Sequence, residues 1–269
     1  MKRVLITGAA GNIGTRLRTE LSGIYPVLRL SDVAAMSPAG NGEEVVPCDL
    51  RDAAAVGDLL RDVDGVIHLG GISGEAPFPE IMEANILGLY NLFEATRQAG
   101  TRRIVFASSN HAVGFYRRTQ TVDHSAPLRP DSRYGLSKAF GEGLASLYAD
   151  KHGLEIMCIR IGNANDAPLD ARRLAIWISY RDLAQLCRIG LETPELHFEV
   201  VYGQSDNARS WWNNRNADRL GYRPQDSAED HVRAAMDAQA NLPPDPVGDE
   251  FQGGTFCSEE FDSQTDRIP

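Results

Sequence analysis

Lysine is almost absent from this chain. Only Lys2, Lys138 and Lys151 occur among 269 residues, so arginine supplies nearly all of the 27 basic side chains. The 37 acidic residues outnumber the basic ones, and the formal net charge is −10 at pH 7. Because nucleic acids and anionic membranes repel such a charge, we expect neither as a partner.

Long hydrophobic runs and cysteine motifs are also lacking. No apolar stretch reaches the roughly 20 residues that a transmembrane helix needs. The N-terminal "MKRVLITG" leads directly into a strand pattern and not into the apolar core of a signal peptide, which favours a cytoplasmic enzyme. The four cysteines show no metal-ligand spacing, so we expect no metal site. Cys48 and Cys158 lie in or beside apolar runs, which predicts buried thiols.

The chain does show a regular alternation of two patterns. Short β-branched apolar runs predict strands at 3–7, 26–32, 44–50, 65–71, 103–109, 155–162 and 197–203. Between them, apolar residues spaced three and four apart predict helices at 12–22, 52–62, 80–100 and 131–153. Apolar strands that alternate with helices indicate an α/β fold, a Rossmann-type doubly wound parallel sheet.

A glycine-rich turn follows the first expected strand. The segment "TGAAGNIG" spaces Gly8, Gly11 and Gly14 as G-x-x-G-x-x-G at the start of the first helix. Such a turn lets the backbone approach a pyrophosphate, whose charge the helix N-terminus stabilises. Asp32 ends the second expected strand, 18 residues after Gly14, where its carboxylate can accept hydrogen bonds from the adenosine ribose. Since this charge would repel a 2′-phosphate, the pattern predicts NAD and not NADP as the cofactor.

A second acid near the same sheet edge has two interpretations. Asp49 ends the third expected strand, where it could contact the adenine or cap the helix expected over 52–62. The sequence leaves both open. The full set of expected NAD contacts is Gly8, Gly11, Asn12, Ile13, Gly14, Asp32, Asp49, Leu50, Leu69, Tyr134, Lys138 and Ile161.

The segment "YGLSK" places Tyr134 and Lys138 four residues apart, and therefore on one side of a helix. A Lys138 cation beside Tyr134 would lower the pKa of the phenol, which is about 10 for a free tyrosine. Tyr134 would then accept a proton near neutral pH. Ser109 ends the fifth expected strand, at the sheet edge where such folds bind ligands. We therefore predict Tyr134, Lys138 and Ser109 as catalytic residues.

These motifs together resemble a known family. The glycine turn, Ser109, and Tyr134-x-x-x-Lys138 at 25 residues beyond that serine match the signature of the extended short-chain dehydrogenases. More narrowly, the chain resembles the uronate dehydrogenases along essentially its full length. The segments that carry this resemblance are "HLGGIS" (68–73), "FASSNH" (106–111), "YGLSKAFGE" (134–142), "RIG" (160–162) and "FQGGTF" (251–256).

The resemblance implies an activity and a substrate site. Uronate dehydrogenases oxidise the anomeric carbon of D-glucuronate and D-galacturonate with NAD, and the products are aldaric acid lactones. The family usually has serine where this chain has Asn163, a longer side chain that still donates and accepts. Without the resemblance, Ser73 could cap a turn, His111 could be a packed histidine and Arg172 could be solvated. The implied uronate contacts are Ser73, Ser109, Asn110, His111, Tyr134, Asn163 and Arg172.

The organisation of the chain follows from the same motifs. Residues 1–165 are expected to form an NAD-binding Rossmann core that carries the Tyr-Lys helix. Residues 166–269 are too few and too irregular for a core of their own. We expect them to form a small substrate-binding lobe over the carboxyl edge of the sheet, adding a strand and helices to the same core, with a tail along the surface. Trp211 and Trp212 are expected to pack in this lobe, and the enzyme is expected to be a homo-oligomer.

Two other functions compete with this prediction. A nucleotide-sugar epimerase or dehydratase uses the same scaffold, but the C-terminal lobe looks too small for a nucleotide diphosphate. A regulatory protein that senses NAD without turnover typically lacks the catalytic tyrosine or lysine, and both Tyr134 and Lys138 are present.

Overall fold

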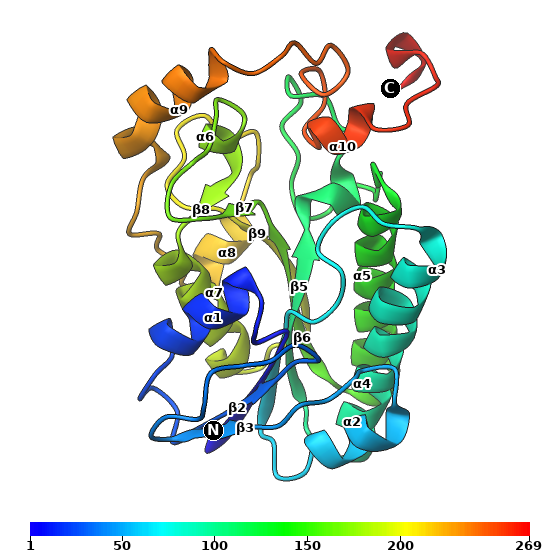
Figure 1. The fold of residues 1–269 in the computed structure, drawn as a ribbon, viewed down its shortest axis with the longest axis vertical. Helices are drawn as coiled ribbons and strands as arrows, with labels where there is room; N and C mark the ends of the chain where they lie inside the picture. The colour runs from blue at the N-terminus through cyan, green and yellow to red at the C-terminus, as the bar shows by residue number, and fades with distance from the viewer.

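The computed structural model describes residues 1–269 and contains one central sheet of seven parallel strands (Figure 1). Their order in the sheet is β3-β2-β1-β4-β5-β6-β9. All seven expected strands are present and the doubly wound Rossmann-type fold is confirmed. The strands are β1 (Arg3–Thr7), β2 (Val27–Ser31), β3 (Glu43–Val45), β4 (Gly65–His68), β5 (Arg103–Ser109), β6 (Glu155–Ile161) and β9 (Phe198–Gly203).

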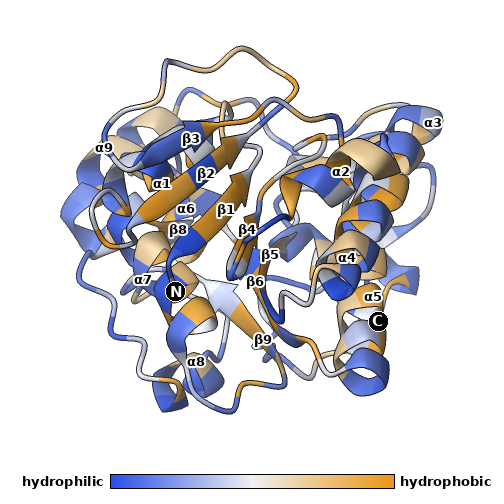
Figure 2. Cartoon of the chain, turned by 90° about the horizontal axis from the view of Figure 1, so that it is seen from below, coloured by the Kyte–Doolittle hydropathy of each residue, from blue (hydrophilic) through white to orange (hydrophobic).

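Helices cover both faces of the sheet (Figure 2). One face packs against α1 (Asn12–Glu20) and α7 (Tyr180–Glu192), and the other against α2 (Ala53–Leu59), α4 (Gly88–Gln98) and α5 (Arg133–His152). Side chains of β1 alternate between two apolar clusters, with Val4 and Ile6 in one and Leu5 in the other. Because both faces are buried, the strands are apolar almost throughout.

The helix expected over 80–100 contains a change of geometry. It begins as α3 (Phe78–Ile81), continues as a π-helical segment, η1 (Met82–Leu87), and ends as α4. Segments of this kind often occur at functional sites. Here Asn85 of η1 accepts from Ile72 N at 2.7 Å and donates to Ile72 O and Ser137 Oγ at 3.0 Å each. The wider turn therefore ties the loop after β4 to α5.

The C-terminal part of the chain lies over the carboxyl ends of the strands (Figure 1). Trp212 is buried there and stacks on Tyr202 of β9 with ring centroids 4.7 Å apart, and Trp211 packs against the same cluster, so the expected packing role of both is confirmed. The remaining elements are η2 (Asn110–Val113), β7 (Asn163–Ala164), α6 (Arg173–Ile176), β8 (Trp177–Ile178), α8 (Arg215–Arg219), η3 (Ala228–His231), α9 (Val232–Gln239), α10 (Thr255–Ser258) and η4 (Thr265–Arg267).

The expectation of a surface tail is wrong for part of the segment after α9. Phe251 and Gln252 are fully buried. The Gln252 side chain accepts from Trp212 Nε1 at 2.9 Å and donates to the carbonyls of Arg117 and Gln120. These contacts come from single side chains in an irregular segment, so no periodic pattern revealed them.

Two further features bear on the class of protein. None of the helices has both the length and the apolar character needed to cross a bilayer. All four cysteines are buried free thiols, as expected for Cys48 and Cys158, and no cluster of three or more His, Cys, Asp or Glu side chains could hold a metal ion.

Candidate active site

A cavity of about 820 Å³ opens along the carboxyl ends of the central strands. Its wall includes the end of β1, the glycine turn before α1, the end of β2, the loop after β4, and α5. In a doubly wound sheet this edge, where the chain turns to opposite faces from neighbouring strands, is the usual place for a ligand. Every residue predicted for the cofactor, the sugar and the chemistry lines this one cavity.

The glycine turn brings the backbone close to the strand beside it. Gly8 has φ +70°, and a Cβ there would lie 2.7 Å from Gly70 N, so a larger residue would not fit. The Asp32 carboxylate accepts from Ala10 N at 2.9 Å and from Ala34 N at 3.0 Å. An open backbone turn at a helix N-terminus with an acid at the end of β2 fits a dinucleotide.

The alternative interpretation of Asp49 as a helix cap is wrong. Strand β3 ends at Val45, and the residue that caps α2 is Asp52, which accepts from the backbone N–H groups of Ala54 and Ala55. Asp49 instead pairs with Arg51 at 2.6 Å while lining the cavity. A contact between Asp49 and the adenine stays a prediction.

The Tyr-Lys pair lies near the start of α5, which two side chains anchor. Ser132 caps the helix by accepting from Gly135 N, and Glu75 accepts from Tyr134 N at 3.0 Å. Lys138 donates from Nζ to the carbonyl of Ala107 at 2.9 Å, and its Nζ lies 5.4 Å from the centre of the Tyr134 ring. Helix capping and tertiary contacts thus hold both side chains beside the end of β5.

The electrostatics of the pair differ from the expectation. Burial raises the pKa of Tyr134 to about 12, although a hydrogen bond with Ser109 acts in the opposite direction. Burial also lowers the pKa of Lys138 to about 8. The protein alone therefore does not lower the Tyr134 pKa as the spacing suggested.

Arg172 is a partly buried cation without an anion at ion-pair distance. Its Nε donates to the carbonyl of Gln252 at 2.9 Å, and Nη2 reaches the side-chain oxygen of Asn110 at 3.2 Å in the amide orientation that satisfies both groups. Burial, followed by the neighbouring Arg173, lowers the pKa of Arg172 to about 10. By contrast, Arg173 forms an ion pair with the buried Asp170. Arg172 is therefore held in place by neutral acceptors alone and is not a solvated loop residue.

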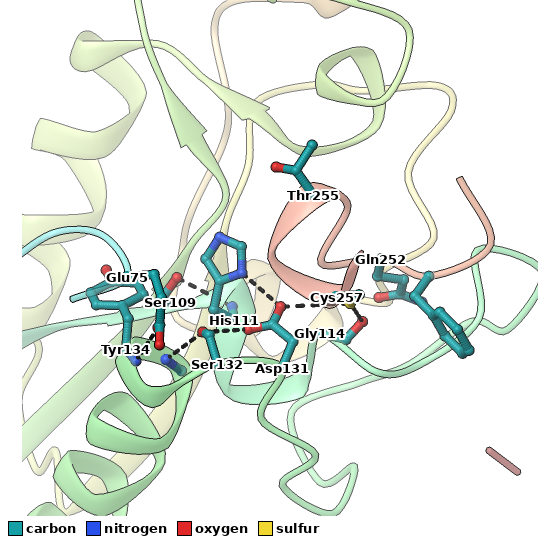
Figure 3. A network of polar contacts seen from close by, with 12 residues as sticks. Glu75, Ser109, His111, Gly114, Asp131, Ser132, Tyr134, Gln252, Thr255 and Cys257 are labelled. Atoms are coloured by element: carbon teal, nitrogen blue, oxygen red, sulfur yellow. Dashed lines mark hydrogen bonds and ion pairs between the residues drawn. The ribbon is translucent and has the colours of Figure 1, made fainter. Parts of the chain in front are cut away.

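The other expected sugar contacts line the same cavity as this arginine. His111 donates or accepts through Nδ1 to Asp131 Oδ2 at 2.7 Å and stacks on Phe256, with ring centroids 3.9 Å apart (Figure 3). Ser73 is exposed in the cavity wall, and no hydrogen bond from its hydroxyl caps a turn. The side-chain oxygen of Asn163 is buried without a partner.

Several residues of the site were not predicted. Phe256 comes from the far end of the chain, Asp131 lies behind His111, and Glu75 and Asn85 fix the loop after β4 to the neighbouring helices. Apart from the segment "FQGGTF", which carried part of the family resemblance, no sequence signal pointed to them. They act through contacts between segments that are distant in the chain.

Comparison with known proteins agrees with this geometry. The NAD dependent epimerase/dehydratase family matches residues 4–175. A uronate dehydrogenase of Pseudomonas putida is 51% identical over 260 residues, which cover 95% of each chain. A uronate dehydrogenase of Agrobacterium fabrum is 45% identical over 267 residues, which cover 98% of this chain and all of the relative.

A solved structure shows the same relationship. The crystal structure of a tyrosine-to-alanine mutant of uronate dehydrogenase from Agrobacterium tumefaciens, complexed with NAD, superposes with a TM-score of 0.92 at 45% identity. The superposed region covers 96% of this chain and 97% of the chain in the crystal structure. The chain belongs to the NAD dependent epimerase/dehydratase family and, within it, to the uronate dehydrogenases.

Proposed function

We propose that this chain uses NAD to oxidise the anomeric carbon of D-glucuronate and D-galacturonate, with an aldaric acid lactone as the product. The relatives named uronate dehydrogenase support the reaction, and the tyrosine-mutant complex supports the cofactor. The single observation that carries the substrate class is Arg172, a partly buried guanidinium in the cavity wall without a carboxylate partner. An unpaired charge withdrawn in part from water favours an anionic ligand.

Tyr134 would remove the proton of the anomeric hydroxyl, while the hydrogen on C1 leaves as hydride and the C1–O bond becomes the lactone carbonyl. Bound NAD supplies the hydride acceptor. Ser109 would hydrogen-bond the same oxygen from the end of β5, and it already lowers the pKa of Tyr134. Lys138 uses one of its three N–H donors on Ala107, which leaves two for the nicotinamide ribose.

Arg172 would bind the carboxylate of the uronate. A guanidinium has five N–H donors, and the contacts with Gln252 and Asn110 use two of them. The remaining planar edge can pair with a carboxylate through two hydrogen bonds. This local positive charge is needed because a protein with a net charge of −10 repels an anionic sugar at long range. The other proposed sugar contacts are Ser73, Ser109, Asn110, His111, Tyr134 and Asn163.

A homo-oligomer stays a prediction, and the outer surface of α4 and α5 supports it. Large apolar side chains that are 38–50% exposed lie there, and a second copy would cover them. Sedimentation of the purified chain tests this, and a monomer at all concentrations contradicts it. The side chains concerned are Tyr90, Leu136, Phe140 and Leu147.

The test of the proposed function is NADH formation by the purified chain with D-glucuronate, D-galacturonate, D-glucose and UDP-glucose. Turnover with both uronates and NAD, a lactone as the first product in the NMR spectrum, and little turnover with glucose are expected. Equal rates on glucose, or conversion of UDP-glucose without net NADH formation, would overturn the proposal.

A further inference from the structure

Behind His111 lies a carboxylate that the chemistry above does not use. The side chain of Asp131 is completely buried, and its Oδ2 lies 2.7 Å from His111 Nδ1 (Figure 3). No arginine or lysine forms an ion pair with it. Apart from His111, the Cys257 thiol, a weak donor, lies 3.9 Å from the same oxygen. A buried carboxylate with one histidine partner controls where that histidine carries its proton.

The surroundings of Asp131 leave it a single orientation. Ser132 Oγ accepts from Gly135 N, so its only proton is donated to Asp131 Oδ1 at 2.7 Å. Gly114 and Gly253, from two other segments, pack so closely that a Cβ at either would overlap the carboxylate. The second oxygen, Oδ2, therefore faces the imidazole and cannot rotate away.

An ionised carboxylate only accepts hydrogen bonds, so His111 donates from Nδ1 to Asp131. Phe256 stacks on the ring, and a ring turned over would place a C–H group against the carboxylate in place of Nδ1. The other ring nitrogen, Nε2, makes no hydrogen bond to the protein, and His111 lines the cavity within 5.8 Å of the Tyr134 ring, centroid to centroid. In the neutral ring, Nε2 is a lone-pair acceptor at the place where the sugar would lie.

We propose that Asp131 is a positioning residue, which holds His111 with its proton on Nδ1 so that Nε2 accepts a hydrogen bond from a hydroxyl of the bound sugar. This inference rests on the proposed function and names a determinant of its specificity. A site that accepts at this point favours a sugar with a hydroxyl there over its deoxy analogue, because the nitrogen would otherwise lose its partner.

The direct test is the protonation state of His111, read from the ¹⁵N chemical shifts of histidine-labelled protein and assigned with a His111→Gln variant. A proton on Nδ1 alone is expected. A proton on Nε2 alone, or on both nitrogens, overturns the proposal. Because this measurement needs no turnover, its failure is distinguishable from failure of the proposed function.

The matched variant is Asp131→Asn, which keeps the shape of the side chain. Ser132 still donates to the Oδ1 position, so the amide oxygen faces the serine and the amide nitrogen faces His111 Nδ1. His111 must then carry its proton on Nε2. We expect kcat/KM for glucuronate to fall roughly ten- to hundredfold, mainly through KM, because a sugar hydroxyl and Nε2 would both be donors. An altered protonation state with an unchanged KM overturns the role in sugar binding.

A second variant separates this effect from a general loss of structure. In Asp131→Asn/Ser132→Ala nothing donates to the Oδ1 position, so the variant can fold with the amide oxygen, and not the amide nitrogen, toward His111. Because Ser132 also caps α5, Ser132→Ala alone is the reference. The double variant should regain the proton on Nδ1 and a KM close to that of Ser132→Ala. A double variant that keeps the proton on Nε2 would contradict the orientation argument.

Discussion

The nucleotide end and the sugar end of the cavity are built in different ways. At the predicted nucleotide end, the turn from Gly8 to Gly14 and Asp32 lie within 25 consecutive residues, and a backbone N–H of this turn holds the Asp32 carboxylate. At the proposed sugar end, Ser73, His111 and Arg172 come from separate segments of the chain. Phe256, near the C-terminus, stacks on His111 there.

The two ends also differ in whether their charged side chain has a partner within the protein. Asp32 is satisfied by backbone N–H groups before any ligand binds. Arg172 is partly buried with neutral hydrogen-bond acceptors only, and desolvation lowers its pKa to about 10. A cation held in this way is less stable than it would be beside a carboxylate. The carboxylate of a bound uronate would provide the anionic partner that the protein itself does not. At the sugar end, the unpaired Arg172 lowers the stability of the free protein and favours anionic sugars. At the nucleotide end, Asp32 already has hydrogen-bond partners and causes no such loss.

Tyr134→Phe should give the largest effect and affect the chemistry alone. Loss of the phenol removes the proton acceptor, and general base catalysis contributes roughly 10²–10⁴-fold to rates. We expect kcat to fall by that factor while the Kd of NAD, measured by calorimetry, stays within twofold. A variant that keeps more than a tenth of the wild-type rate would remove Tyr134 from the mechanism.

Arg172→Ala should affect the sugar end next. Hydrogen bonds to charged groups contribute roughly 1.5–3 kcal/mol, so kcat/KM for glucuronate should fall about ten- to hundredfold. Activity on glucose, which has no carboxylate, should start low and hardly change. The matched control is Arg173→Lys, which keeps a cation beside the buried Asp170. If this control is the more damaging change, the carboxylate binds at the neighbouring residue.

Asp32→Ala should act on the nucleotide end alone. Removing the carboxylate abolishes the ribose hydrogen bonds and the repulsion of a 2′-phosphate together, so NAD should bind roughly tenfold more weakly and NADP relatively better. The KM for glucuronate should not move. Asp49→Asn, which neutralises a second acid of the same wall, should leave the ratio of NAD to NADP unchanged. An unchanged ratio in Asp32→Ala would instead place the ribose elsewhere.

Lys138→Met removes a proposed catalytic group, but its effect on folding should be the smallest in free energy of this series, a gain in stability of about 1 kcal/mol. Burial lowers the pKa of Lys138 from 10.5 to about 8, which corresponds to roughly 3 kcal/mol of lost stability at pH 7, and the lost hydrogen bond to Ala107 offsets part of the gain. The folded state releases this proton at lower pH than the unfolded state does, so the penalty is complete below pH 8 and disappears as the pH rises to 10.5.

Urea unfolding of the Lys138→Met variant and the wild type at pH 7 and pH 10 measures this difference. The advantage of the variant should shrink at the higher pH. A variant that is less stable at pH 7 would show that the hydrogen bond from Nζ outweighs the burial of the charge.

Much of this protein follows from its sequence alone. The seven strands, the helices between them, the glycine turn and the spacing of Tyr134 and Lys138 are local patterns, because a strand or helix repeats its environment every two or every three to four residues. The family resemblance predicted the sugar contacts as well, and all of the residues concerned line one cavity.

Only the tertiary structure decided the environment of those residues. Neither the position of Asp131 behind His111 nor the burial of Gln252 against Arg172 has a periodic signature, since each contact joins single residues from distant segments. The same holds for charge: spacing suggested that Lys138 lowers the pKa of Tyr134, whereas burial raises it to about 12. The burial and pairing of a side chain depend on every segment that packs around it. A local sequence pattern does not specify which distant segments those are.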